Sequence, residues 1–287
     1  MAETVAAVAA TAGWAGRLSL QYRREGARTL AHDRHDGPLR VLQALYPEGP
    51  GICHHVLVHP PGGIVGGDRL DIDVAVGVDC HALITTPGAT RFYRSGGRPA
   101  SQHARLRVEA GARLEWLPLE TIAYPGCEAT NEVTFELADG ASLLGWDLLA
   151  LGLPAAGAAF DSGRFTQALA WRGRWRERGC LRAADHRLLR SPLGLGGRGV
   201  LGCAWFAFGG RSDEALMQAL LDTARGAIAS SPLADAAAAT LPQPGLLVLR
   251  LLAHRTEPAL ALLAAVRAAW RQRAWGLAAA PPRVWRT

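Results

Sequence analysis

Short segments of alternating apolar residues, separated by glycine and proline, fill most of this 287-residue chain. The 33 glycines and 17 prolines are many for a helical protein and suit strands joined by tight turns. Turn signals recur at intervals of roughly ten residues, which is typical of a sandwich, a barrel or a solenoid of stacked strands. Strands are predicted over Leu18–Tyr22, Val41–Tyr46, Ile52–Val58, Leu70–Val76, His81–Thr85, His103–Val108, Arg113–Leu117, Glu132–Leu137, Ser142–Leu149, Arg164–Ala170 and Val200–Phe208.

The last quarter of the chain carries helix signals, namely a capping residue followed by acids and a proline in a first helical turn. The elements predicted there are a helix from Ser212 to about Ala229, a strand over Leu246–Leu252 and a helix from Glu257 to about Ala274. We therefore predict a disordered Ala-rich tail over residues 1–13 and one domain over residues 14–287. The β-rich body of that domain extends to about residue 210, and the two helices and the strand occupy residues 211–275.

Composition narrows the class of protein. Glycine, proline or arginine interrupts every apolar run well before it reaches the length of a bilayer span, so no transmembrane helix is expected. Glu3 stands where a signal peptide has basic residues. The five cysteines are scattered and form no Cys-x-x-Cys pair, which argues against a disulfide framework or a structural zinc site and favours small buried residues. We expect a soluble, cytoplasmic protein.

The most unusual segment is His59–Leu70, which reads HPPGGIVGGDRL. Its prolines fix the backbone at the entrance, and its glycines permit positive φ and close approach of another segment. The segment therefore predicts a compact loop that carries Asp68 to the start of the next strand. Because functional groups often stand on rigid loops of a β scaffold, this loop is the first candidate site. The structural glycines of the loop are Gly62, Gly63, Gly66 and Gly67.

Three carboxylates stand in surroundings that favour a special role: Asp68, Glu120 and Asp147. Glu120 follows a proline turn, and Asp147 interrupts an apolar run that would bury it. A buried acid needs a partner, a proton or a cation. With 31 arginines and no lysine in the chain, an arginine partner is as good an explanation as a cation. Oxygen ligands alone would hold a transition-metal ion only loosely.

Three histidines, His54, His55 and His59, suggest a metal site until strand geometry is applied. Neighbours in a strand point to opposite faces, and His55 and His59 lie roughly 13 Å apart along an extended strand. The three cannot share one ion without a bend, and His59 has the best case because it opens the loop. A second turn, Thr85–Ser95 (TTPGATRFYRS), could cradle an anion but lacks a Walker lysine and a following helix.

Two other functions compete with a cation route. In a metal-dependent hydrolase, Asp68, Asp71 and Asp73 would act with His59, since alternating acids lie roughly 7 Å apart on one strand face. The absence of a general base makes this the weaker interpretation. Nucleic-acid binding would use the arginine- and tryptophan-rich segment Trp171–Arg178 (WRGRWRER), although a solvated hairpin or a protein interface is favoured there.

Taken together, these segments resemble the urease accessory protein family UreD, also called UreH. Five motifs carry the resemblance, which extends from about Gly16 to Trp275. They are HPPGGIVGGDRL at His59–Leu70, TTPGATRFYRS at Thr85–Ser95, LEWLPLETIAYP at Leu114–Pro125, GWDLLALG at Gly145–Gly152 and SPLGLGG at Ser191–Gly197.

The resemblance implies a non-enzymatic role and a β-helix-like stack of strands with two C-terminal helices. UreD-like proteins assemble with UreF and the GTPase UreG on apo-urease and assist nickel insertion, with a homodimer allowed in that complex. No tightly bound cofactor is implied, only transient Ni²⁺ in an internal tunnel. The residues that would line such a route are Asp68, Glu120, Asp147 and His59, with Thr85 and Thr86 as hydroxyl neighbours.

One more expectation concerns the second C-terminal helix. Its apolar face could contact UreF, although packing into the core is the more ordinary use of such a face. The residues on this face are Leu260, Leu263, Val266 and Trp270.

Overall fold

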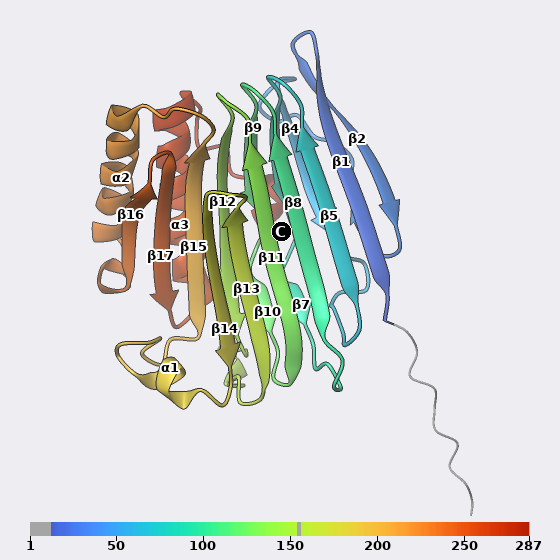
Figure 1. Ribbon diagram of the computed structural model, residues 1–287, viewed down its shortest axis with the longest axis vertical. Helices are drawn as coiled ribbons and strands as arrows, with labels where there is room; N and C mark the ends of the chain where they lie inside the picture. The colour runs from blue at the N-terminus through green and yellow to red at the C-terminus, as the bar shows by residue number, and fades with distance from the viewer. Residues whose placement is uncertain (1–12, 154–155, 287) are drawn as a thin grey trace, which may run out of the picture.

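Two β-sheets lie face to face, and two helices cover the outer side of the larger sheet, in the computed structural model of the protein (Figure 1). The structure describes residues 13–153 and 156–286, so the tail predicted over residues 1–13 falls outside the described residues except for Gly13. The predicted β-helix-like stack with two C-terminal helices is confirmed. Within the two described ranges, no helix has the length and apolarity that a membrane span requires.

The chain builds the stack by passing alternately between the two sheets. Each pass adds one strand to the smaller sheet and one to the larger, and successive strands in each sheet pair in parallel. The alternating strands are β4 (Ile52–Val58), β5 (Arg69–Val76), β6 (His81–Thr85), β8 (Ala100–Val108), β9 (Arg113–Leu117), β11 (Cys127–Leu137), β12 (Ser142–Leu151) and β13 (Gly163–Trp171).

Antiparallel strands complete both sheets at their edges. The smaller sheet has the order β14-β13-β11-β8-β5-β1-β2, and the main path of the larger sheet is β16-β17-β15-β12-β9-β6-β4-β3. The remaining elements are β1 (Ala15–Glu25), β2 (Arg28–Asp36), β3 (Arg40–Val41), β7 (Thr90–Phe92), β10 (Thr121–Ala123), β14 (Trp175–Arg182), β15 (Val200–Phe208), β16 (Ala237–Gln243), β17 (Leu246–Ala253), the short helix α1 (His186–Arg190) and the 3-10 turns Ala234–Ala236 and Arg283–Arg286.

Strand alternation divides each sheet into an apolar inner face and a different outer face. Across the smaller sheet, Leu18, Ile72, Ala104, Val133 and Leu169 stand in register on neighbouring strands. All five are buried in the core between the sheets. Because side chains alternate with a period of two, the residues between these positions face away from that core.

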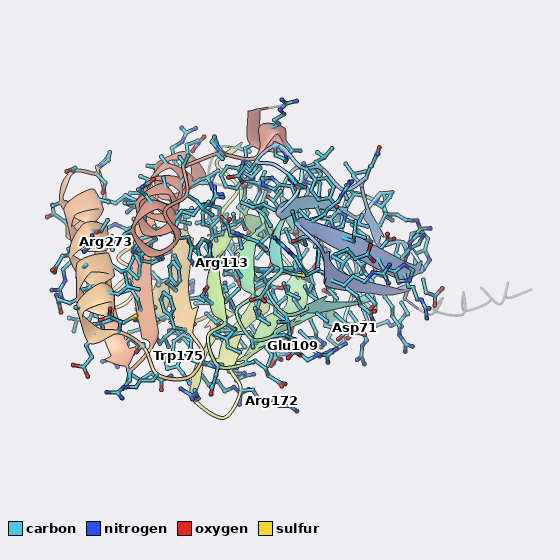
Figure 2. The ribbon with its side chains drawn as sticks, turned by 90° about the horizontal axis from the view of Figure 1, so that it is seen from above. Asp71, Glu109, Arg113, Arg172, Trp175 and Arg273 are labelled. Carbon is cyan, nitrogen blue, oxygen red and sulfur yellow. The ribbon has the colours of Figure 1, made fainter. Side chains whose placement is uncertain are left out.

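The outer face of the smaller sheet is charged, and it holds the acids of the hydrolase hypothesis. Asp71 Oδ2 accepts a hydrogen bond from Arg69 Nε at 2.7 Å, and Asp73 Oδ1 accepts one from Arg105 Nε at 2.7 Å. Figure 2, seen from above, shows Asp71 on this outer side, away from the helices. These acids are therefore members of ion pairs on the outer face of the sheet, where the arginines cover Asp71, and this accounts for their alternating pattern.

Helices α2 (Glu214–Ala229) and α3 (Thr256–Trp275) pack on the outer face of the larger sheet and form a second apolar cluster with it. The N-cap of α2 is Asp213, whose carboxylate accepts from the backbone N–H groups of Ala215 and Leu216, one residue later than predicted. The face of α3 proposed as a partner contact is used for this packing, with Leu263, Val266 and Trp270 buried and Leu260 partly buried.

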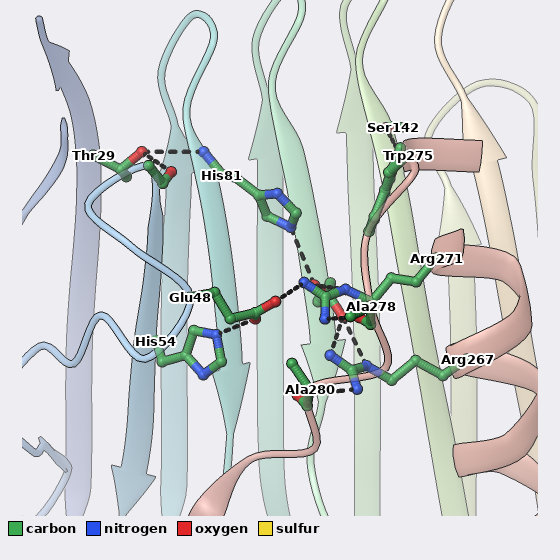
Figure 3. A network of polar contacts seen from close by, with 12 residues as sticks. Thr29, Glu48, His54, His81, Ser142, Arg267, Arg271, Trp275, Ala278 and Ala280 are labelled. Carbon is green, nitrogen blue, oxygen red and sulfur yellow. Dashed lines mark hydrogen bonds and ion pairs between the residues drawn. The ribbon is translucent and has the colours of Figure 1, made fainter. Parts of the chain in front are cut away.

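A buried charge network fixes the end of α3 and the segment that follows it (Figure 3). Glu115 on β9 is 0% exposed and receives Arg267 at 2.7 Å, Arg271 at 3.1 Å and His81 at 3.1 Å. Arg271 also contacts Glu48 at 2.6 Å. The same two arginines donate hydrogen bonds to backbone carbonyls of residues 278–280. Through these arginines, Glu115 connects α3 and the segment after it to the larger sheet.

Two local predictions were wrong. The strand predicted over Val41–Tyr46 is reduced to β3 at Arg40–Val41 and an isolated bridge at Leu45, because the Tyr46–Glu48 region leaves the sheet. Of the five cysteines, all free, Cys180 and Cys203 are only partly buried, because each lies on or beside the smaller sheet's open edge.

Candidate functional site

The glycine-rich loop between β4 and β5 is held by its own carboxylate. Asp68 Oδ1 accepts from the backbone N–H of Trp14 at 2.8 Å, and Oδ2 accepts from that of Val65 at 3.0 Å. A Cβ at Gly66 would lie 1.8 Å from the backbone carbonyl oxygen of Ser95, so this position requires glycine. The loop is the compact unit that the sequence predicts, and within it Asp68 serves as a brace.

A cavity of about 280 Å³ lies beside this loop, between the two sheets. Its polar lining includes His59, Thr86, Arg91 and Gln102. Burial lowers the pKa of His59, and the Asp68 charge opposes this effect, so the imidazole is neutral at pH 7. We call this space the loop cavity.

Thr85 is held by two hydrogen bonds. It borders the loop cavity, but its hydroxyl donates to the Leu117 carbonyl oxygen at 2.6 Å and accepts from Trp285 Nε1 at 2.8 Å. The Thr85 hydroxyl is therefore used both as a donor and as an acceptor. The Thr86 hydroxyl donates to the Gly88 carbonyl oxygen in the cavity wall. The two hydroxyl groups predicted to act as neighbours thus have separate local roles.

A second cavity, of about 510 Å³, lies at the open edge of the stack, between β13 and β14 on one side and β15 to β17 on the other. Its polar lining consists of Asp147, Gln167, Glu177, Cys203, Asp235 and Arg250. We call it the edge cavity. Glu177 and Arg250 form an ion pair that joins the two sheets at this cavity.

Asp147 is the buried carboxylate that lines the edge cavity. It stands on β12 opposite Cys203 of β15, which in turn stands opposite Arg250 of β17, so the three side chains share the inner face of the larger sheet. Burial raises the pKa of Asp147 to about 6, although hydrogen bonds from Gln167 and Asn131 work in the opposite direction. Burial also raises the pKa of the Cys203 thiol, which is therefore protonated at neutral pH.

Three amide side chains connect the two cavities. Gln102, Asn131 and Gln167 occupy registered positions on β8, β11 and β13, all on the inner face of the smaller sheet. Gln102 Nε2 donates to Asn131 Oδ1 at 3.2 Å, and Asn131 Nδ2 donates to Asp147 Oδ2 at 3.2 Å. We call these three residues the amide ladder. It is a polar track through an otherwise apolar interior.

The other predicted site residues lie apart from this track. Glu120 is partly exposed, and its backbone carbonyl accepts from Thr90 N–H at 2.9 Å. His54 faces the helices and contacts Glu48, whereas His55 faces the core and contacts the Tyr22 hydroxyl at 2.7 Å, as the strand argument predicts. Among the described residues, no three His, Cys, Asp or Glu side chains gather closely enough to hold a metal ion.

The sequence singles out Asp147 and His59 as candidates but gives no direct sign of the amide ladder. Each of its members interrupts a run of apolar residues at the inward positions of a strand, as Asn131 does between Ala129 and Val133. That signal can be recognised only when it is known which alternate residues of the strand face the core. Asparagine and glutamine are ordinary surface residues, so their side chains alone do not indicate an interior role.

Comparison with known proteins gives consistent matches over nearly the whole chain. The family model described as "UreD urease accessory protein" matches residues 15–286. A protein of Leptothrix cholodnii named "Urease accessory protein UreD" is 57% identical over 276 residues, which cover 96% of this chain and 99% of that protein. Proteins of the same name from Albidiferax ferrireducens and Variovorax paradoxus are 54% and 53% identical, over 95% and 96% of this chain and 99% of each relative.

Proposed function

Because the chain belongs to the UreD family of urease accessory proteins, we propose that it acts on apo-urease as a non-catalytic scaffold that helps to insert nickel. In this proposal it assembles in the cytoplasm with UreF and UreG, and it can dimerise within that complex. The nickel ion is cargo that passes through the protein, and no resident cofactor takes part.

The amide ladder is the observation that supports this function most directly. It joins the loop cavity to the edge cavity through hydrogen bonds that end on Asp147. Burying polar groups costs free energy unless they are hydrogen-bonded, and the hydrogen bonds of the row offset this cost. We infer that the row is a route by which a hydrated cation crosses between the sheets.

The chemistry of the lining suits transfer better than storage. Nickel binds tightly where several histidine nitrogens or thiolate sulfurs converge, and the described residues contain no such group. Amide oxygens and the buried carboxylate of Asp147 offer contacts from which an ion can leave. Asp147 carries a negative charge above pH about 6, so it can attract a cation at physiological pH.

The test is the nickel content of urease made with variants of the ladder. Gln102→Leu and Asn131→Leu keep the approximate side-chain volume but remove the polar groups. Gln21→Leu is the matched control, since Gln21 is exposed on the outer face of β1. Each variant is co-expressed with urease, UreF and UreG, and the assembled complex is isolated before urease nickel is measured.

We expect both ladder variants to assemble normally and to leave urease several-fold poorer in nickel, whereas the Gln21 variant matches the wild type. Normal nickel content with either ladder variant would exclude the interior route. Loss of assembly in the wild-type control reaction would instead overturn the accessory function itself.

A further inference from the structure

The positive charge of this protein is concentrated in one segment. Residues 172–198 contain eight arginines and two acids, Glu177 and Asp185, which leaves a surplus of six positive charges (8 − 2 = 6). The formal net charge of the whole chain is also +6. The rest of the sequence is therefore balanced in formal charge, and this one segment carries the whole surplus.

The two acids of this segment do not neutralise its outer surface. Glu177 faces inward and pairs with Arg250 at the edge cavity, and Asp185 accepts from Leu188 N–H as the N-cap of α1. On β14, Arg176 and Arg178 have the opposite parity to Glu177 and so face outward.

Most of the arginines have no acidic partner to hold them. Arg172 pairs with Glu136, and Arg182 borders a shallow hollow that Glu128 and Asp161 also line. By contrast, no carboxylate within the described ranges forms an ion pair with the exposed residues Arg176, Arg178, Arg187 and Arg190.

A fully exposed leucine projects from the same region. Leu193 is 100% exposed, on the loop that follows α1 beyond the lower end of β14 in Figure 1. The neighbouring Leu195 is buried and anchors the loop to the core. We call residues 185–198 the α1 loop.

The α1 loop is rigidly built around this exposed side chain. Ser191 supplies a backbone carbonyl to the N–H groups of Gly194 and Gly196, and its hydroxyl accepts from Leu193 N–H at 3.2 Å. A Cβ on Gly194 would lie 2.1 Å from the Leu188 carbonyl oxygen, so the turn requires glycine. A preorganised loop loses little conformational freedom when it binds, which favours a docking function.

We propose that Leu193 and the surrounding arginines dock into an apolar socket rimmed by carboxylates on apo-urease. The identity of the partner rests on the proposed function. The chemistry of its surface follows from the exposed Leu193 and the surplus positive charge. Nucleic acid fits less well, because Trp171 is buried and Trp175 faces the same inner side, so neither offers a stacking surface. The α1 loop is distinct from the amide ladder and the cavities.

The experiment measures the affinity of the complete accessory complex, containing UreF and UreG, for purified apo-urease. Leu193→Asp removes the exposed apolar side chain. Leu42→Asp is its matched control, because Leu42 is also an exposed leucine and lies outside the segment. The double variant Arg187→Glu/Arg190→Glu reverses two charges. Arg17→Glu/Arg34→Glu makes the same charge change on β1 and β2, at exposed positions.

We expect Leu193→Asp to weaken binding about 10- to 100-fold, the range for losing one buried leucine side chain. The α1 charge reversal should weaken binding and flatten its dependence on salt, while both controls retain wild-type affinity. Unchanged affinity of both α1 variants overturns the proposal, and so does a loss of RNA or DNA binding in place of urease binding. If wild-type complex itself fails to bind apo-urease, the proposed function fails instead.

Discussion

Asp147 shows how a single residue combines structural cost with function. Its carboxyl group is buried, and its pKa rises to about 6 from the ordinary 3.8 because burial disfavours the charged form. A protein gains no stability from ionising such a group. The retention of an acid at this position is understandable if the charge is used, and the proposed cation route supplies that use.

Replacement of Asp147 by asparagine should therefore stabilise the protein at neutral and alkaline pH. The folded state binds this proton more tightly than the unfolded chain, so wild-type stability falls as pH rises from about 4 to above 6. Above that range Asp147→Asn should raise the free energy of unfolding by about 2 to 3 kcal/mol, and near pH 4 the difference should vanish.

Urea unfolding of both proteins between pH 4 and pH 8 measures this difference. Asp222→Asn, at an exposed position on α2, serves as the control and should show no such dependence on pH. A constant difference between Asp147→Asn and the wild type across the range would mean that the carboxyl group is ionised throughout.

At the scale of elements, Glu115 decides how the helical layer attaches to the sheet. Burial alone raises the pKa of this carboxyl group, but Arg267, His81 and Arg271 outweigh burial and lower the pKa to about 2. The contribution of Glu115 to stability is therefore complete above pH 4.5, its ordinary pKa, and is lost as pH falls towards 2.

Glu115→Gln should destabilise the protein by about 3 to 5 kcal/mol at pH 7, because buried Arg267 loses its carboxylate partner and Arg271 keeps only Glu48. Glu136→Gln removes an exposed partner of Arg172 and should cost about 0 to 1 kcal/mol. Thermal unfolding of the two variants compares them directly. Equal, small losses would show that the buried network is not needed to hold α3.

The sequence predicts elements well where one face is buried and turns are marked. His81–Thr85, Arg113–Leu117 and Val200–Phe208 have the predicted bounds, because glycine, proline or acids mark their ends. The exposed edge strands β2 and β14 lack that apolar signal. Most of their side chains are polar or charged, so the apolar alternation that marks the other strands is weak in them.

For the site, the sequence identifies single residues but not their connection. Asp147 is recognisable as an acid in an apolar run, whereas its link to Gln102 depends on the register of three strands from successive coils. Asp68 has a structural use that the sequence does not show. A carboxylate after a glycine-rich loop suggests a ligand, but the backbone N–H groups of Trp14 and Val65 use both of its oxygens.

At the scale of the molecule, three regions have different roles. The inner space holds the polar track, the outer face of the larger sheet binds the helices, and the edge with β14 and α1 carries the surplus charge. The solenoid explains this division, because each coil adds the same two inner faces and the two ends remain free to differ.

The most direct test of the central claim is whether Ni²⁺ reaches Asp147. Nickel(II) with oxygen ligands is paramagnetic and broadens the NMR signals of nuclei near it, so the side-chain carboxyl carbons of carbon-13-labelled aspartates can be followed during a nickel titration of the assembled complex. At pH 7.5 we expect strong broadening of the Asp147 signal. At pH 5 the broadening should weaken, because the carboxyl group is protonated below its pKa of about 6. Broadening confined to surface aspartates such as Asp73, with Asp147 unaffected at either pH, would contradict the interior route.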